Sequence, residues 1–295
     1  MLLFAMKTNA LSALFTATVL LISCQETTIV NNLADGSSTG PPVSGYFKKN
    51  VLIEDYTGTW CGNCTRVSWA IEEASTTSDK VVPVAIHNGN DPYHFLGLAP
   101  LKNLILPNSP LALPVSRLNR MDVWFSPETS NVQQAIDLTG NNTTIGLAMS
   151  SIVANGTINL NVKVKCLEDY NSLKLVVYLL EDKLYYLQFN YNSNLYNGVN
   201  PFPNFEHNHV LRASLTDILG EPIPNEELVN GSSYTRNFTI PIPTMTPPSN
   251  FPNVSPNINP QNISFVAFVT RGEDNKAINA RASHANENQQ FEENP

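Results

Sequence analysis

Charged residues are scarce in this 295-residue chain, where Asp, Glu, Lys and Arg together make up 14%. There is no run of basic residues, and the formal net charge is -8. Proteins that bind nucleic acids neutralise phosphates with Lys and Arg, so nucleic-acid binding is not expected. Hydrophobic residues reach 42%, which is enough apolar material for a substantial core.

Long apolar runs are also lacking, and the longest, from about Ala10 to Ile22, is short for a transmembrane helix. It follows a single cation, Lys7, as the hydrophobic part of a signal peptide does. The run ends in Leu21-Ile22-Ser23-Cys24, which resembles the lipobox of bacterial lipoproteins. This resemblance implies that Cys24 is lipidated and becomes the new N-terminus. An ordinary signal peptide that contains a cysteine is the alternative.

Cysteine is scarce too, but two of the four cysteines form the motif Cys61-Gly62-Asn63-Cys64. The apolar segments 51–56 and 81–86 on either side of it predict strands. Between them, apolar residues at helical spacing predict a helix with one buried face: Val67, Ala70, Ile71 and Ala74. The pair thus lies at a helix N-terminus, where unpaired N–H groups favour a thiolate. We expect Cys61 to be the exposed attacking cysteine and Cys64 the more buried resolving one.

The segment Tyr56–Cys64, with Trp60 directly before the first cysteine, is similar to the active-site segment of thioredoxins. The resemblance implies that Asp55 is the buried acid that assists proton transfer. It also implies that Leu113-Pro114 is the cis-proline segment facing the cysteines, and that Trp60, Leu113 and Pro114 contact a bound peptide. Prolines and glycines between residues 87 and 113 predict a short or irregular crossover helix. A closing helix is expected from about Pro127 to Leu138.

Each of these residues has another interpretation. The cysteine pair could be half of a zinc site, although no second CxxC exists, or a static structural disulfide. Asp55 could be only a polar residue at a strand end, and Pro114 an ordinary trans proline in a loop. His87, at the end of a strand, could tune the cysteines or be a hydrogen-bonded loop residue.

From about residue 143 onward the hydrophobic pattern changes to alternation, which is typical of half-buried strands. The alternation is clearest in Ile158–Cys166, directly after the hairpin signal Asn155-Gly156. Six further strands are expected, at residues 144–153, 173–180, 209–215, 234–242, 263–270 and 277–282. The expected architecture is an all-β antiparallel sandwich of the immunoglobulin-like kind, with Cys166 as a buried, inert thiol.

Two long loops interrupt these strands, and long loops are often functional. Residues 185–205 carry seven aromatic side chains, which either bind peptide or sugar or pack the loop onto the sandwich. Residues 241–260 carry seven prolines. His207 and His209 lie two apart and could share a strand face as metal ligands, but no third ligand is evident, so no metal site is expected.

Four segments carry a wider resemblance: Tyr56–Cys64, Pro114–Arg120, His207–Arg212 and Ile263–Thr270. With them the chain resembles a family of lipoproteins of Bacteroidetes-type bacteria, the group related to the 28-kilodalton outer membrane protein. This resemblance implies an outer-membrane location, lipid-anchored on the periplasmic or cell-surface face. It also implies a thioredoxin-like α/β domain followed by a β-sandwich, and it supplies no activity.

The expected layout is a lipoprotein signal peptide, a polar tether, a thioredoxin-like domain, a β-sandwich domain and a polar tail, at residues 1–23, 24–46, 47–140, 141–284 and 285–295. The leading hypothesis is a membrane-anchored thiol–disulfide oxidoreductase, with Cys61 and Cys64 exchanging and Asp55 moving protons. The alternative is a non-catalytic surface lipoprotein that uses the same scaffold to bind a partner. The expected partner is a protein thiol or disulfide, or another envelope protein; no cofactor is expected.

Overall fold

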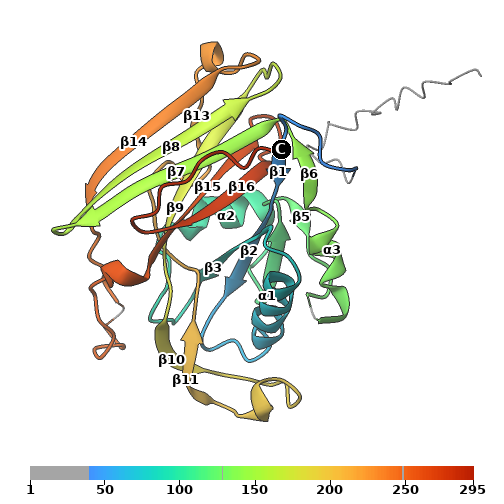
Figure 1. The fold of residues 1–295 in the computed structure, drawn as a ribbon. Helices are drawn as coiled ribbons and strands as arrows, with labels where there is room; N and C mark the ends of the chain where they lie inside the picture. Colours follow the sequence, from blue (N-terminus) through green and yellow to red (C-terminus); the bar gives the residue numbers. More distant parts are fainter. Residues whose placement is uncertain (1–39, 128, 248) are drawn as a thin grey trace, which may run out of the picture. The chain divides into compact units, whose positions relative to one another are not determined.

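The computed structural model describes residues 40–127, 129–247 and 249–295. The predicted signal peptide, Cys24 and most of the predicted tether lie outside these residues. Within them, strands predominate over helices, and they form several sheets (Figure 1). None of the described helices has the length and apolar character needed to cross a membrane.

The described strands are β1 (Phe47–Lys49), β2 (Val51–Thr57), β3 (Val81–His87), β4 (Val115–Leu118), β5 (Asp122–Val123), β6 (Gly140–Thr143), β7 (Ile145–Ala154), β8 (Thr157–Cys166), β9 (Leu173–Glu181), β10 (Leu184–Gln188), β11 (Phe202–His207), β12 (Val210–Ser214), β13 (Glu221–Pro222), β14 (Ser233–Pro241), β15 (Ile263–Arg271) and β16 (Ala277–His284). The described α-helices are α1 (Thr65–Thr77), α2 (Leu98–Ile105) and α3 (Gln133–Ile136). Short 3-10 turns lie at Thr129–Asn131, Tyr196–Gly198, Asn225–Glu227 and Pro260–Asn262.

The largest sheet joins strands from both halves of the sequence, in the order β16-β15-β9-β12-β3-β2-β4-β5, with β13 pairing β9. The β2–β3 and β3–β12 pairs are parallel, whereas the other pairs are antiparallel. Its two halves meet where β12 runs beside β3, and the N–H of Ala85 donates to the carbonyl of His209 at 2.8 Å. Strands from both sides of the boundary predicted at residue 140 therefore share one hydrogen-bonded sheet.

A second sheet, of order β14-β8-β7, packs over the β9–β15 part of the largest sheet and encloses an apolar core. The alternation predicted for β8 is confirmed, because its inward residues are all buried: Ile158, Leu160, Val162, Val164 and Cys166. The other six predicted strands correspond to β7, β9, β12, β14, β15 and β16. This packing of two sheets is consistent with the predicted β-sandwich.

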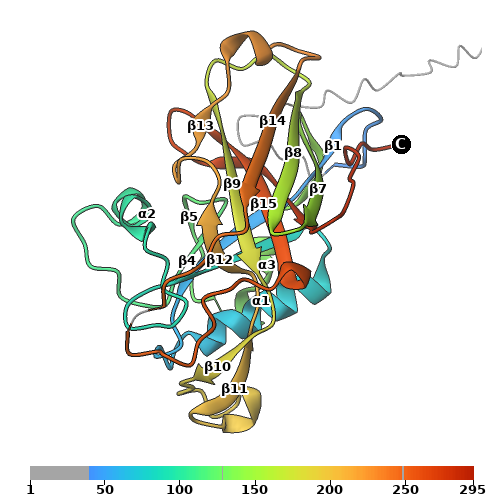
Figure 2. The same ribbon diagram turned by 90° about the vertical axis from the view of Figure 1, so that its left-hand side faces the viewer.

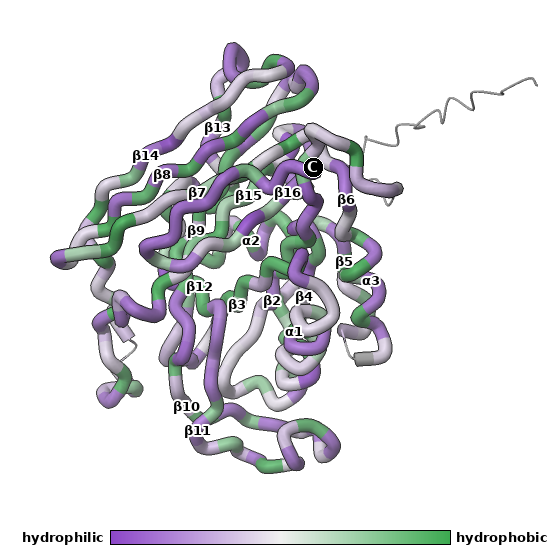
Figure 3. The backbone as a smooth tube through the Cα atoms, viewed as in Figure 1, coloured by the Kyte–Doolittle hydropathy of each residue, from purple (hydrophilic) through white to green (hydrophobic). Residues whose placement is uncertain are grey.

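Strand β9 is buried on both faces, which explains its uninterrupted run of apolar residues. Val177 and its neighbours at every second position face the three-stranded sheet, whereas Tyr178 and its alternates face the layer that contains α2. Strand β2 is buried in the same two-sided way. Figure 3 shows the hydrophobic stretches that result along the central strands.

Helices α1 and α2 cover opposite faces of the largest sheet (Figure 2). The predicted apolar face of α1 is buried and packs against Val51 and Ile53 of β2. Helix α2 packs against Leu52 and Tyr56 on the other face of β2. It spans eight residues, as expected for a short crossover.

The closing helix predicted from Pro127 to Leu138 is wrong in length, since only the 3-10 turn at Thr129–Asn131 and the four-residue α3 form. The amide of Gln134 donates to the carbonyl of Val123 at 2.7 Å, and the side chain of Asn131 donates to the carbonyl of Phe125. These side-chain bonds to the backbone hold a turn where a longer helix would begin.

Both ends of the described chain are bound to the fold. The N–H of Val43, within the predicted tether, donates to Asn142 at 2.7 Å, and the N–H of Asn294 donates to the carbonyl of Tyr46 at 2.7 Å. The predicted polar tail runs along β7, where the N–H of Gln289 donates to the carbonyl of Met149 at 2.8 Å. The last residues of the predicted tether are therefore part of the folded structure.

A fully buried ion pair links the two halves of the largest sheet. Arg120, which follows β4, contacts Glu54 of β2 at 3.2 Å and donates to the hydroxyl of Tyr178 on β9. Its guanidinium also lies over the ring of Phe268 on β15, 4.6 Å from the centroid. Burial alone would lower the pKa of Arg120, but neighbouring Tyr178 and Glu54 raise it, so the charge is retained.

We predict that Arg120→Met destabilises the protein by about 3–5 kcal/mol, because it leaves the Glu54 carboxylate buried without its partner. The double variant Arg120→Met/Glu54→Leu should recover much of this loss, since it removes both charges. Guanidinium unfolding monitored by circular dichroism measures both differences.

A control is Arg236→Met, which removes a half-buried cation at the surface, paired with Glu221 at 3.0 Å. This surface variant should change the free energy of unfolding by no more than about 1 kcal/mol. Equal effects of the two single substitutions would contradict the importance assigned to the buried pair.

Candidate functional site

The cysteine pair lies in the turn between β2 and α1, as the sequence predicts. Cys61 and Cys64 form a disulfide, with their Cα atoms 5.4 Å apart. The N–H of Cys61 donates to the carbonyl of Gly58 at 2.9 Å, and Cys64 is the N-cap residue of α1. The disulfide therefore sits at the positive end of the helix dipole.

Cys61 is not the exposed cysteine that was expected, since only 5% of its surface is accessible. The backbone of its turn is bound by residues 188–192, which we call the covering segment, at the end of β10 and the start of the loop to β11. The N–H of Phe189 donates to the carbonyl of Thr59 at 2.8 Å, and the N–H of Tyr191 donates to the carbonyl of Gly62 at 2.8 Å. The amide of Gln188 donates to the carbonyl of Cys61 at 3.0 Å.

The ring of Tyr191 lies directly against Gly62. A Cβ atom at Gly62 would come within 2.5 Å of that ring, a distance that no packed side chain tolerates. The first residue between the two cysteines must therefore be glycine while this tyrosine keeps its place.

Side chains of the same region also bind helix α1. The hydroxyl of Thr65 donates to Asn190 at 2.9 Å and accepts from the amide of Asn192 at 2.7 Å. Further along, the hydroxyl of Tyr196 donates to Glu72 at 3.0 Å, and its ring packs edge-on against Trp69. The hairpin β10–β11 and its loop are thus fastened to the disulfide turn and to the helix that follows it.

The segment predicted as a loop at residues 185–205 begins and ends in strands, because β10 and β11 pair in antiparallel fashion and form a hairpin with a long connecting loop. Several of its aromatic rings pack on one another, for example Phe202, Phe205 and Tyr196. Because the hairpin covers the disulfide turn, the expectation that its aromatics pack onto the sandwich is wrong for this part. The sequence signal was the density of aromatics, but nothing in it pointed to a partner more than 100 residues earlier.

A second buried group, Asp91, fixes the turn from the other side. Its carboxylate accepts from the N–H of Thr59 at 2.6 Å and from the N–H of Tyr93 at 2.7 Å, and it pairs with His87 at 3.0 Å. Burial alone would raise the pKa of Asp91, but the His87 charge and these hydrogen bonds hold it below its usual value. His87 is therefore a hydrogen-bonded partner of Asp91.

Asp55 lies on β2, six residues before Cys61, and only 2% of its surface is accessible. Burial raises the pKa of Asp55 to about 7, and the hydroxyl of Ser116, which donates to it at 3.4 Å, opposes the rise only weakly. A carboxyl with such a pKa exchanges protons readily at neutral pH.

Of the remaining predicted residues, Trp60 belongs to the turn itself, and Leu113 and Pro114 directly precede β4. The Leu113–Pro114 peptide bond is cis, and it directly precedes β4, whose Val115 pairs with Tyr56 of β2. Trp60 is 42% exposed, and its indole N–H donates to the carbonyl of Asn88 at 2.8 Å. Cys24 lies outside the described residues.

The other titratable candidates lie in the sandwich core and at or just after the end of β11. Cys166 is a buried free thiol in the sandwich core, and burial raises its pKa to about 11. His207, at the end of β11, is buried, whereas His209 pairs with Asp182 at 3.3 Å. Among the described residues, no group of three or more His, Cys, Asp or Glu side chains is placed to hold a metal ion.

Comparison with known proteins identifies a family. Residues 111–289 match the family model described as "Outer membrane protein Omp28". Among solved structures, HBP35 of Porphyromonas gingivalis is similar with a TM-score of 0.61 at 17% identity, over 85% of this chain and 81% of that one. A domain of the outer membrane lipoprotein Omp28 from the same organism is 23% identical over 50% of this chain and 91% of its own, with a TM-score of 0.30. No curated protein matches the chain significantly.

The raised pKa of Asp55 predicts a pH-dependent stability. Because its folded-state pKa of about 7 exceeds the ordinary value of 3.8, the stability linked to its proton is present below pH 4 and is lost as the pH rises through 7. The Asn side chain of Asp55→Asn does not titrate in this range. The free energy of unfolding of this variant, relative to that of the wild type, should therefore rise by on the order of 4 kcal/mol between pH 4 and pH 8. Urea unfolding at a series of pH values measures the difference, and Asp79→Asn, at an exposed position, is the control. Parallel stability curves for wild type and Asp55→Asn would contradict the assignment.

Proposed function

This chain belongs to the Omp28 family of outer membrane proteins, and we propose that it is a lipid-anchored scaffold whose Cys61–Cys64 disulfide is structural. Its location is the outer membrane. In this proposal, the disulfide turn and the covering segment hold each other in place, and the protein acts by binding another envelope protein.

The scaffold that we propose is thioredoxin-like. Parallel strands β2 and β3 flank α1, with the cysteine pair at its N-terminus, and the antiparallel strands β4 and β5 continue the sheet beyond β2. Helix α2 lies between β3 and β4 in the chain, as a crossover helix would. This order of elements supports the domain proposed at residues 47–140, although its sheet continues into β12 and β9.

The burial of Cys61 carries the proposal of a structural disulfide. Thiol–disulfide exchange requires an attacking thiolate to reach a sulfur atom of the disulfide. Here 5% of Cys61 and 1% of Cys64 are accessible, and backbone hydrogen bonds from Phe189 and Tyr191 bind the covering segment to the carbonyls of Thr59 and Gly62. An approaching protein thiol would first have to displace this segment.

A second candidate function is exchange that the covering segment gates. Asp55 favours it, because a buried carboxyl with a pKa of about 7, on the strand that leads into the cysteine turn, is suited to proton transfer. In that case Cys61 would attack or be attacked, Cys64 would resolve, and Trp60, Leu113 and Pro114 would contact the substrate once the segment had moved.

The reduction of insulin by dithiothreitol separates these functions. We predict that the wild type accelerates it no more than Cys61→Ser/Cys64→Ser does, because its disulfide is covered. Gln188→Ala/Tyr191→Ala removes the side chains that cap the turn, and a purely structural disulfide should leave this variant inactive as well.

Two results would contradict this prediction, and each would indicate something different about the disulfide. Turnover by the wild type would contradict the structural disulfide outright. Turnover only by Gln188→Ala/Tyr191→Ala would support gated exchange, provided that adding the two cysteine substitutions to it abolishes the gain.

The lipid anchor that we propose rests on Cys24 and the lipobox-like residues before it. Acyl chains on that cysteine would hold the protein on the bilayer, since each buried methylene contributes about 0.8 kcal/mol. A protein partner fits the excess of acidic over basic residues better than a nucleic acid does.

We predict that Cys24→Ser moves the protein from the outer-membrane fraction to the soluble envelope fraction, because no acyl chain can then be attached. Immunoblotting of fractionated cells measures the distribution. Cys166→Ala, which removes the buried free cysteine of the sandwich core, is the matched control and should stay with the membrane. Membrane retention of Cys24→Ser would exclude this anchor.

A further inference from the structure

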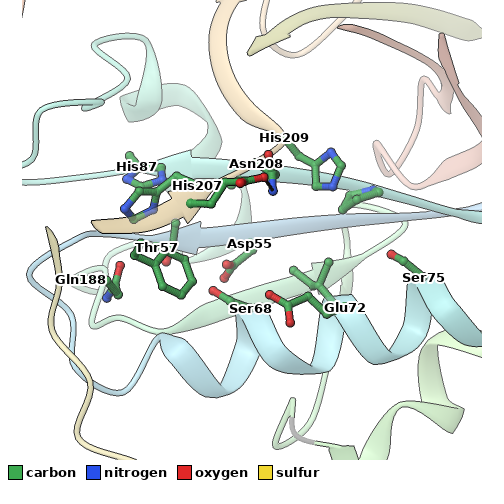
Figure 4. A pocket seen from close by; sticks show the side chains of 15 residues that line it. Asp55, Thr57, Ser68, Glu72, Ser75, His87, Gln188, His207, Asn208 and His209 are labelled. Atoms are coloured by element: carbon green, nitrogen blue, oxygen red, sulfur yellow. Dashed lines mark hydrogen bonds between the residues drawn. The ribbon is translucent and has the colours of Figure 1, made fainter. Parts of the chain in front are cut away.

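A cavity of about 160 Å³ lies beside the disulfide turn, between the β2–β3 part of the sheet, helix α1 and strand β11 (Figure 4). Asp55 of β2 lies near its middle, with Ser68 and Glu72 of α1 on one side and His207 on the other. A cavity of about 150 Å³ is large enough for a molecule the size of benzene. The space is therefore adequate for a small organic ligand.

Two buried polar side chains of this cavity, Asp55 and His207, have acceptor atoms with few or no donors. Among the described residues, Asp55 receives one hydrogen bond, a long one of 3.4 Å from Ser116. His207 is 5% exposed, and its Nε2 atom is buried with no hydrogen-bond partner. Burial lowers the pKa of His207 to about 3, so the ring is neutral and this nitrogen is available to accept. An unsatisfied buried acceptor is costly, and a ligand that donates would remove that cost.

The charged residues that line the cavity also favour a ligand that donates hydrogen bonds. None of the fifteen residues that line it is a lysine or arginine. Two of its histidines, His87 and His209, are paired with carboxylates outside the lining, Asp91 and Asp182, whereas the Asp55 carboxylate has no cationic partner among the described residues. Glu72 and Glu206 are exposed at its mouth, where carboxylates raise the local concentration of cations. The rest of the lining is partly apolar, with Ile71 and Phe205 among it.

We propose that this cavity binds a small organic cation, whose ammonium group donates to the acceptor-rich wall formed by Asp55 and His207 while an apolar body of about benzene's size fills the remainder. The proposal does not depend on whether the Cys61–Cys64 disulfide exchanges. It assigns Asp55 to a ligand, as the counter-ion of an ammonium group. It also gives the β10–β11 hairpin a role, because the hairpin supplies one wall of the cavity.

Isothermal titration calorimetry with three probes of equal size tests this assignment at pH 8, where the Asp55 carboxyl, with its pKa of about 7, is mostly ionised. We expect benzylammonium to bind saturably, benzyl alcohol to bind more weakly, and benzoate not to bind. Asp55→Asn should weaken benzylammonium binding by about tenfold or more, as expected for the loss of a charged hydrogen bond, and leave benzyl alcohol nearly unchanged.

Two further variants complete the test. Glu206→Gln, exposed at the mouth, leaves the core intact and should weaken benzylammonium binding by a smaller factor. Glu73→Gln, on α1 but outside the lining, is the matched control and should bind as the wild type does. Failure of benzylammonium to bind, equal binding of benzoate, or an Asp55→Asn variant with unchanged affinity would each overturn the proposal.

Discussion

The charge of Arg120 has no contact with solvent, so it must be compensated within the protein by Glu54 on β2 and by the hydroxyl of Tyr178 on β9. These groups belong to segments that are far apart in the sequence, and they meet only when the largest sheet is complete. Pairing a buried charge in this way disfavours alternative strand arrangements, because any other arrangement leaves the charge unpaired. The position of β2, and with it the turn that carries the cysteines, follows from this contact.

Two segments that are distant from that turn in the sequence bind to it. Asp91 holds Thr59 from the side of β3, and residues 188–192 bind Thr59, Cys61 and Gly62 from the hairpin. The turn is therefore held through its backbone, and the disulfide is one restraint among several. The cysteine motif is thus part of the packing of the molecule, and Asp55 is buried on the strand that leads into it.

Local patterns in the sequence predicted local structure well. The alternation in β8 and the apolar face of α1 each depend on one buried side, and periodicity reports that directly. The cysteine pair at the start of α1 could be placed for the same reason. The sheet that joins β3 to β12 and the cover over Cys61 could not, because both depend on contacts between residues more than 100 positions apart. The burial of Cys61 was missed for this reason, and with it the cavity beside Asp55.

The close approach of Tyr191 to Gly62 changes how the dipeptide between the cysteines should be interpreted. In open redox sites, those two residues are free to vary and help to set the reduction potential. Here the first of them is fixed by the aromatic ring above it. Related chains can accordingly be divided by the residues at the positions of Gly62 and Tyr191. A chain with a side chain larger than glycine at the first position must have lost or moved the aromatic ring. Such chains are the ones in which to look for an accessible disulfide.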